Sequence, residues 1–283
     1  MDISRVRSSK ETARSGVKHV RPKQSLGQNF LIDDNIARNI VRDLHIEDDD
    51  ILIEIGPGKG ALTRHLAGKA KHLIAMEIDG RVVEGLRTAY ESRNVEILHQ
   101  DFLECSLLEL SSRFRRRLRL IGNIPYHLTS PILFKSFEEH SALRDLTIML
   151  QREVAKRIVA QPSTKDYGIL AVMTGFYGTP KILFNVSPNC FYPKPKVESS
   201  VLCIQFHSKK AFQVEEKLFT LVVKSTFGKR RKTLRNGLQY LPFDEEVLKR
   251  IISLDSPMLE RRPEELSVEQ FVELTNQIEA SIS

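Results

Sequence analysis

The stretch ILIEIGPGKGAL, residues 51–62, decides the fold. Its first five residues form an apolar-rich run, which is typical of a strand buried on both faces of a parallel sheet. Gly56, Gly58 and Gly60 follow, and glycines let the backbone turn sharply and approach a ligand without a Cβ in the way. The stretch therefore predicts a buried strand, a ligand-binding turn and the start of a helix.

Six further strand-like runs follow this stretch, and helix-compatible segments separate the first five of the seven. This alternation is typical of a parallel sheet with helices on both faces. The last two runs are joined by a proline-rich loop without a helix, so we expect them to pair antiparallel at one edge. The predicted fold class is α/β, a Rossmann-like, mostly parallel seven-stranded sheet with an antiparallel edge. The six runs are residues 72–78, 95–98, 118–122, 145–150, 181–186 and 200–206.

The chain is predicted to contain an extension and two domains. Residues 1–22 are basic and poor in large apolar side chains, so we expect a disordered amino-terminal extension. The Rossmann-like domain spans residues 23–208. Beyond it the strand signal stops, and residues 209–283 read as helices separated at prolines, a small all-helical domain.

The charge distribution indicates a polyanionic partner. The chain has 43 Lys and Arg against 36 Asp and Glu, a net charge of +7. Residues 244–283 carry −6, so residues 1–243 carry +13. Such a surplus attracts nucleic acid, whereas binding to an anionic membrane would come with an amphipathic helix or a lipidation signal.

Other classes of protein are disfavoured by what the sequence lacks. No apolar run approaches the roughly 18–20 residues of a bilayer span, and no secretory signal is apparent, so a cytoplasmic protein without a membrane partner is expected. Cys105, Cys190 and Cys203 lie far apart without CxxC spacing. This spacing argues against a disulfide framework and a zinc site, so no metal is expected.

Acidic residues beside the glycines suggest which cofactor binds. Glu77 ends the next predicted strand, where a carboxylate accepts hydrogen bonds from ribose hydroxyls. The pattern Gly56-x-Gly58-x-x-Ala61 also fits NAD. However, Glu54 and Asp101 add negative charge that would repel a pyrophosphate and attract a sulfonium and an ammonium. We therefore predict S-adenosylmethionine, bound by Glu54, Gly56, Gly58, Gly60, Glu77 and Asp101, with Asn123 beside it.

The segment NIPY, residues 123–126, predicts the chemistry. An exocyclic adenine nitrogen is a poor nucleophile because its lone pair is delocalised into the ring. The side-chain carbonyl of Asn123 and the backbone carbonyl of Ile124 can accept its two hydrogens and aim the lone pair at a methyl group. Pro125 fixes the loop, and Tyr126 offers a face to a flipped base, with Phe191 as a candidate for the opposite face.

A basic segment near the start of the helical domain predicts an RNA-binding surface. Read as one helix, residues 224–235 place Phe227 and Leu234 on one face and basic side chains on another. Such a helix would present its basic face to phosphates. A second arginine-rich cluster at 113–119 is equally compatible with a solvated surface. The predicted RNA-binding residues are Lys224, Lys229, Arg230, Arg231, Lys232 and Arg235.

Taken together, the motifs resemble those of the ribosomal RNA adenine N6,N6-dimethyltransferase family, and within it the bacterial KsgA type. The resemblance covers residues 23 to about 240 in the right order. Besides residues 56–60 and 123–126, it depends on the segments QSLGQNFL at 24–31, QREVA at 151–155 and FYPKPKV at 191–197.

This resemblance implies the class I S-adenosylmethionine-dependent methyltransferase fold, and we expect a monomeric enzyme. It implies dimethylation of two adjacent adenosines near the 3′ end of small-subunit ribosomal RNA, within a partly assembled small subunit whose biogenesis the enzyme assists. The implied base contacts are Tyr126 and Phe191. The implied cofactor contacts are Asn29, Leu31, Gly56, Glu77, Asp101 and Asn123.

Two alternatives stay open at this point, and a third is disfavoured. Ile124 stands where many small-subunit relatives have Leu, and Ile is also familiar in the large-subunit methyltransferases of macrolide resistance. A non-catalytic RNA-binding assembly factor on the same fold would need only the basic surfaces. An NAD-dependent dehydrogenase is disfavoured, because none of the eight histidines has a motif around it that would serve as a proton relay.

Overall fold

The computed structural model describes residues 20–23, 26–229 and 232–282. The chain divides into two compact units, here called the sheet unit (residues 1–155 and 181–206) and the helical unit (residues 156–180 and 207–283). Most of the predicted amino-terminal extension, residues 1–19, lies outside the described residues. None of the helices in the described ranges is long and apolar enough to cross a membrane.

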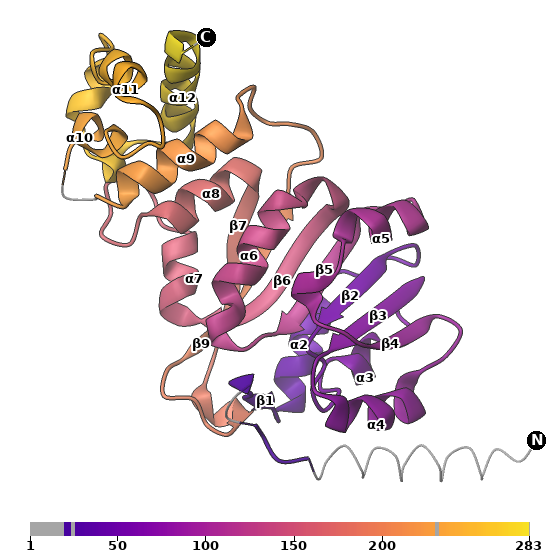
Figure 1. The fold of residues 1–283 in the computed structure, drawn as a ribbon. Helices are drawn as coiled ribbons and strands as arrows, with labels where there is room; N and C mark the ends of the chain where they lie inside the picture. The colour runs from indigo at the N-terminus through magenta and orange to yellow at the C-terminus, as the bar shows by residue number, and fades with distance from the viewer. Residues whose placement is uncertain (1–19, 24–25, 230–231, 283) are drawn as a thin grey trace, which may run out of the picture. The chain divides into compact units, whose positions relative to one another are not determined.

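A seven-stranded sheet forms the centre of the sheet unit, with the strand order β4-β3-β2-β5-β6-β9-β7 (Figure 1). β2 pairs parallel with β3 and β5, β3 with β4, and β5 with β6. β9 runs antiparallel to β6 and has β7 as its other neighbour, so the sheet has the predicted antiparallel edge. The strands are β2 (Ile51–Ile55), β3 (His72–Glu77), β4 (Val95–His99), β5 (Leu118–Asn123), β6 (Leu143–Gln151), β7 (Gly178–Val186) and β9 (Ser199–Phe206).

Local signals explain where several helices begin. The Asp33 side chain accepts hydrogen bonds from the backbone N–H groups of Asn35 and Ile36, which caps α2. Asp79 caps α4 in the same way through Arg81. The helices along this part of the chain are α2 (Asp34–Asp43), α3 (Thr63–Leu66), α4 (Gly80–Tyr90), α5 (Leu107–Phe114), α6 (Thr129–Glu138) and α7 (Arg152–Ile158).

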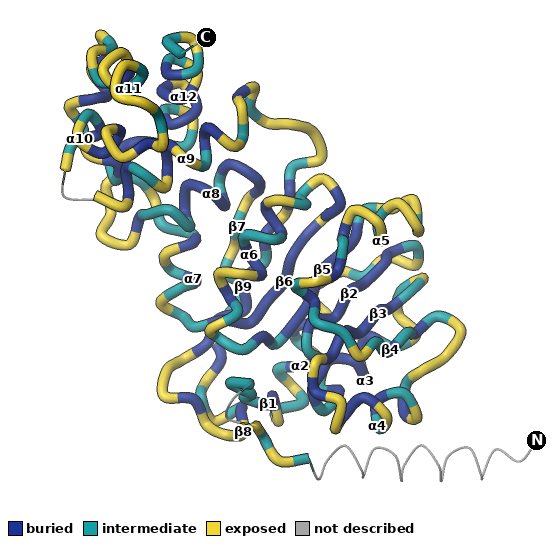
Figure 2. The backbone as a smooth tube through the Cα atoms, in the orientation of Figure 1, coloured by how far each residue is buried: buried dark blue, intermediate teal, exposed yellow. Residues whose placement is uncertain are grey.

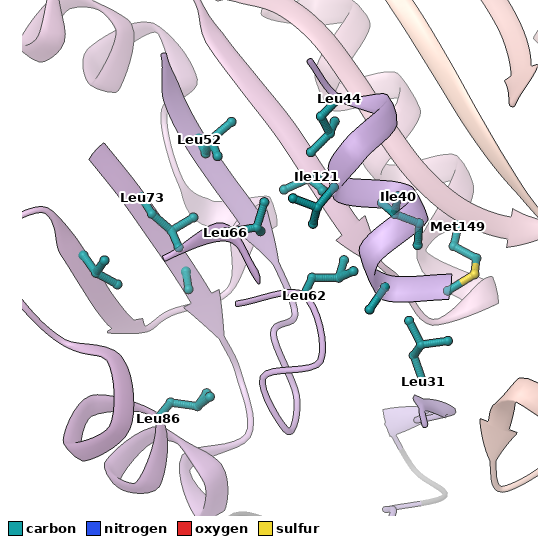
Figure 3. Packing of buried hydrophobic residues seen from close by; sticks show 14 of the residues in the cluster. Leu31, Ile40, Leu44, Leu52, Leu62, Leu66, Leu73, Leu86, Ile121 and Met149 are labelled. Atoms are coloured by element: carbon teal, nitrogen blue, oxygen red, sulfur yellow. The ribbon is translucent and has the colours of Figure 1, made fainter. Parts of the chain in front are cut away.

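The core of the sheet unit lies between the strands and these helices. β2 is buried along its whole length, and the strands in the middle of the sheet are mainly dark blue in Figure 2. Leu52 and Leu73 from the sheet belong to the same buried cluster as Leu66 from α3 and Ile40 from α2 (Figure 3). Each side chain of this kind contributes about 1.5–3 kcal/mol by leaving water.

A second, two-stranded sheet pairs β1 (Phe30–Leu31) with β8 (Phe191–Tyr192). The strands are antiparallel, with Phe30 opposite Tyr192 and Leu31 opposite Phe191. Directly opposite residues share a face. Leu31 and Phe191 accordingly both lie in the buried core cluster. This small sheet joins the start of the described chain to the proline-rich loop.

The helical unit has its own aromatic core. Phe176 on α8 stacks on Phe219 on α9, with the ring centroids 4.1 Å apart, and Phe227 contacts Phe271 at 5.8 Å. The stacking of Phe176 on Phe219 joins α8, within residues 156–180, to α9, whereas a single boundary near residue 208 was predicted from the sequence. Its helices are α8 (Ile169–Tyr177), α9 (Glu216–Phe227), α10 (Leu234–Leu238), α11 (Glu245–Ile252) and α12 (Val268–Ile282).

The single helix predicted over residues 224–235 is wrong. α9 ends at Phe227 with Gly228 as its carboxyl-terminal cap, and α10 begins only at Leu234. In between, the N–H of Lys229 donates to the carbonyl of Thr226, and the N–H of Lys232 donates to that of Lys229. Phe227 and Leu234 are both buried, but they lie on two different helices. Their spacing of seven residues, which is typical of one helical face, therefore does not come from a single helix.

Candidate active site

A cavity opens where the parallel strands of the sheet unit end. β2, β3 and β5 run in one direction, so their carboxyl ends meet at one edge, where ligands bind in open α/β sheets. The loops after these strands and after β4 line the cavity, together with the segment before β1. Predicted site residues in the lining are Asn29, Leu31, Glu54, Gly56, Gly58, Glu77, Asp101, Asn123, Ile124 and Pro125.

Two glycines of the loop after β2, residues 56–60 and here called the glycine loop, allow close contacts with different side chains. Gly58 has φ +54°, and a Cβ there would lie 3.0 Å from the ring of Phe30. Gly60 has φ +77°, and its Cβ would lie 2.9 Å from Tyr90 on α4. Gly58 therefore allows an aromatic side chain to pack on the loop. Gly60 packs against a helix and is not among the residues that line the cavity, although the sequence grouped it with the cofactor contacts.

Glu77 is held rigidly at the end of β3. It is 4% exposed, and its two carboxylate oxygens accept hydrogen bonds from the N–H groups of Gly58 (2.8 Å) and Asp79 (2.9 Å). Burial raises the pKa of this carboxyl, and the two N–H donors oppose the rise. Each oxygen keeps a second lone pair, so the carboxylate can still accept from ribose hydroxyls.

Glu54 lies deeper than Glu77. It is 1% exposed, and its Oε2 atom has no hydrogen-bond partner among the described residues. Burial, reinforced by the nearby charge of Glu77, raises the pKa of Glu54 to about 8. Burial thus favours the neutral form of this carboxyl. An ammonium group bound beside it would favour its ionised form.

Asp101 follows β4 and forms another part of the wall. Its side chain accepts a hydrogen bond from the N–H of Leu103 at 2.9 Å, which fixes the carboxylate at the start of a short turn. Phe102 and Ile78 line the cavity beside it. An acid next to apolar walls suits a purine, whose rings need apolar contacts and whose amino group needs an acceptor.

The predicted catalytic segment begins at the end of β5. The side-chain amide of Asn123 donates through Nδ2 to the backbone carbonyl of Asn29, 3.0 Å away. Ile124 and Pro125 line the same cavity as the cofactor candidates. The Tyr126 hydroxyl lies 2.8 Å from Ser199 Oγ, and burial raises the pKa of this phenol. Tyr126 is not among the residues that line the cavity.

Phe191 and its neighbour Tyr192 have opposite environments. Phe191 is 3% exposed and belongs to the core cluster, whereas Tyr192 is 60% exposed. Phe191 does not line the cavity, so the structure does not bring it together with Asn123 in the same pocket. The alternation of sides along β8 accounts for the difference.

Sequence reasoning missed several residues that line the cavity. Phe30 packs on Gly58, and the ammonium of Lys59 lies 4.9 Å from the centre of the Phe30 ring. Gln28 and His127 also contribute to the lining. Gln28 and Phe30 belong to the segment at 24–31 that carried the family resemblance, and their place in the motif was the only signal for them.

The predicted RNA-binding residues are in varied surroundings. Lys229 and Lys232 lie near the exposed Tyr240, with their ammonium groups 4.4 and 5.7 Å from its ring centre. Arg235 instead forms an ion pair with Glu260 (2.7 Å) and donates to the carbonyl of Ile252. Lys224 lies in the last turn of α9. Arg230 and Arg231 fall outside the described residues.

Most arginines of the 113–119 cluster are engaged within the protein. Arg113 pairs with Glu96, Arg116 with Asp49, and Arg117 donates to the carbonyl of Phe206. Arg119 is buried in an ion-pair network. These contacts favour a structural role for the cluster over an RNA-binding role.

Comparison with known proteins agrees with this geometry. The family model described as Ribosomal RNA adenine dimethylase matches residues 20–279. A protein named Ribosomal RNA small subunit methyltransferase A from Caldanaerobacter subterraneus is 40% identical over 261 residues, covering 91% of this chain and 97% of that protein. One of the same name from Alkaliphilus metalliredigens is 41% identical over 266 residues, covering 92% and 93%.

Solved structures show the same fold. A dimethyladenosine transferase from Plasmodium falciparum matches with a TM-score of 0.74 at 23% identity, covering 89% of this chain and 98% of that one. The 23S rRNA methyltransferase ErmE matches with a TM-score of 0.62 at 24% identity, covering 88% and 100%. The fold, the arrangement of the cavity and the family match lead to one conclusion: the chain belongs to the ribosomal RNA adenine dimethylase family.

Proposed function

We propose that the protein transfers methyl groups from S-adenosylmethionine to N6 of two adjacent adenosines near the 3′ end of small-subunit ribosomal RNA. The observation that carries this proposal is that Asn123 and Ile124 line the same cavity as Glu77 and Asp101. Acceptors for an adenine amino group thus adjoin acceptors for a nucleoside cofactor. The names of the relatives at about 40% identity support the small subunit as the target.

The residues of the cavity fit this cofactor. Glu77 would accept from the ribose hydroxyls, Asp101 from the adenine amino group, and Glu54 would face the ammonium of the methionine part. When bound, the cofactor supplies an electrophilic methyl group on a sulfonium. Buried acids suit that positive charge better than they would suit the pyrophosphate of NAD.

The chain's own contribution to the chemistry is orientation. Asn123 Oδ1 and the Ile124 carbonyl would accept the two N6 hydrogens and localise the nitrogen lone pair. The lone pair would then be aimed at the methyl group that the bound cofactor supplies, with the thioether as the leaving group, and the proton released from nitrogen would pass to solvent. A non-catalytic assembly factor would not need these acceptors beside a cofactor cavity, which disfavours that alternative.

The remaining parts of the proposal concern the setting of the enzyme. The helical unit would bind RNA phosphates through its lysines, and the enzyme would act as a cytoplasmic monomer without a metal. The decisive experiment is mass spectrometry of ribosomal RNA from cells that lack the protein. Small-subunit RNA should lose its dimethyladenosine. Retained small-subunit dimethyladenosine, or loss from the large subunit, would contradict the proposal.

Cofactor binding can be tested without RNA. Titration calorimetry should show binding of S-adenosylhomocysteine and no heat with NAD. Glu77→Ala should weaken binding by about 10- to 100-fold, since hydrogen bonds to a charged group contribute about 1.5–3 kcal/mol. Glu84→Ala, an exposed carboxylate on α4 paired with Arg87, is the control and should bind normally. Tight NAD binding would overturn the cofactor assignment.

If the lysines of the helical unit contact RNA phosphates, the affinity for small subunits should depend on salt through them. Replacing both Lys229 and Lys232 by Gln should flatten the slope of log affinity against log salt by up to about 2, roughly 0.7–0.9 per phosphate contact. Arg235→Gln should change this slope less, because its guanidinium already binds Glu260. Equal slopes for the lysine double variant and the wild type would reject phosphate contacts by these two lysines.

A further inference from the structure

The catalytic amide of Asn123 has a donor end and an acceptor end, and only the acceptor end can serve adenine N6. Nδ2 donates to the backbone carbonyl of Asn29 at 3.0 Å, which leaves Oδ1 to accept. With the amide reversed, two oxygens would face each other at this contact and an NH₂ group would face the substrate amino group. The Asn29 carbonyl thus selects the productive orientation.

We infer that Gln28 is a positioning residue, whose side chain holds the Asn29 carbonyl in place and thereby orients the amide of Asn123. This inference rests on the proposed function. Gln28 Nε2 donates to Asp79 Oδ2 at 3.0 Å, and Gln28 Oε1 accepts from the N–H of Lys23 at 2.9 Å. Both ends of the glutamine amide are therefore in use.

Asp79, which accepts the hydrogen bond from Gln28, is itself held by several contacts. Asp79 is 5% exposed, caps α4, and pairs with Arg81, whose hydrogen bond is the main reason that the pKa of Asp79 falls to about 2. Its N–H donates to Glu77 Oε1. Gln28 consequently ties the segment before β1 to the loop that follows β3.

Residues on either side of Gln28 are held in place by packing. At Gly27, where φ is +60°, a Cβ would lie 2.9 Å from His127 Nδ1, in the loop after β5. Phe30 packs against Gly58 on the glycine loop. Gly27 and Phe30 are held by packing, whereas Gln28, the residue directly before Asn29, is held by its side-chain hydrogen bonds to Asp79 and Lys23. Losing these hydrogen bonds should let the Asn29 carbonyl move relative to Asn123.

A double-mutant cycle on turnover tests the inference. Rates are measured with saturating S-adenosylmethionine and saturating undermethylated small subunits, so altered affinity does not enter. Gln28→Ala should lower kcat about tenfold in the wild-type background and hardly at all in the Asn123→Ala background, because coupled residues are not additive. Equal losses in both backgrounds, or no loss in the wild type, would overturn the inference.

Two further variants separate positioning from a general structural effect. Gln28→Lys keeps a donor for Asp79 and should recover much of the lost kcat. Gln100→Ala removes another glutamine that lines the same cavity, and it should not show the coupling to Asn123. Failure of the lysine variant together with coupling at Gln100 would reject a specific role for Gln28.

A measurement without substrate keeps the inference distinct from the proposed function. The side-chain amide of Asn123, identified in nitrogen-15 NMR spectra by its loss in Asn123→Ala, should be protected from hydrogen exchange. Gln28→Ala should reduce this protection, and Gln100→Ala should not. If the wild type fails to methylate small subunits, the proposed function fails, while unchanged protection in Gln28→Ala overturns the positioning role itself.

Discussion

Asn123→Ala should lower the rate of methyl transfer by about 10²–10³, the loss seen when one preorganised polar group is removed from an active site. Without Oδ1, only the Ile124 carbonyl remains to localise the nitrogen lone pair. The measurement is single-turnover methyl transfer to small subunits at saturating cofactor. Binding of the subunit should be nearly unchanged, because the amide contributes orientation and little contact area.

The matched control for this variant is Asn185→Ala. Asn185 is also an asparagine of the sheet unit, but its side-chain oxygen accepts from Ser200 Oγ at 2.7 Å and it is not among the residues lining the cavity. Its loss should leave the rate within a small factor of wild type. Full activity of Asn123→Ala would refute the lone-pair mechanism.

Arg119→Met should lower the free energy of unfolding by about 3–5 kcal/mol, the scale for breaking a buried ion pair from one side. Arg119 is 5% exposed, and its guanidinium lies 2.5 Å from Asp50 Oδ2 and 2.9 Å from Asp145 Oδ2. It also donates to the carbonyl of Leu44 at 2.5 Å. The substitution would leave the buried Asp145 without its ion-pair partner and Asp50 with Arg144 as its remaining cation. Urea denaturation of the variant measures the loss.

The pH dependence of this loss follows from the carboxyls. Burial raises the pKa of Asp145, and the charge of Arg119 opposes that rise, so removing the arginine raises the pKa further. A carboxyl with a raised folded-state pKa destabilises the fold as pH rises above its unfolded value of about 3.9. The variant should therefore lose more stability at pH 7 than at pH 4.

Two comparisons make the result specific. Replacing Asp50 and Asp145 by Asn in the Arg119→Met background should recover part of the loss, because no buried charge is then left unpaired. Arg116→Met removes a half-exposed arginine paired with Asp49 and should cost under about 1 kcal/mol. Similar losses for Arg116 and Arg119 would contradict the role given to burial.

Continuous patterns made much of the sheet predictable. β2 occupies Ile51–Ile55 as expected, because a run of apolar residues between polar ends has few other stable placements. The grouping of acids near the ends of strands was also predictable, because the carboxyl ends of parallel strands meet at one edge of a sheet. Glu54, Glu77 and Asp101 all line one cavity for this reason.

What could not be predicted depends on contacts between distant parts of the chain. β1 and β8 have two residues each, too few for a periodicity, and their pairing is set by tertiary packing. The bond from Asn123 to the Asn29 carbonyl leaves no trace in composition or spacing. Conversely, Phe227 and Leu234 fit one helical face in sequence but lie on two helices, because Gly228 ends the first.

The small sheet of β1 and β8 has a consequence for how related sequences diverge. Phe30 lies opposite Tyr192 and Leu31 opposite Phe191, so a change of side-chain volume on one strand alters the fit of its neighbour on the other. We expect these two pairs to covary in an alignment of relatives, although they lie far apart in the chain. The proline-rich loop and the segment beside the glycine loop would then diverge together, as one unit of evolutionary change.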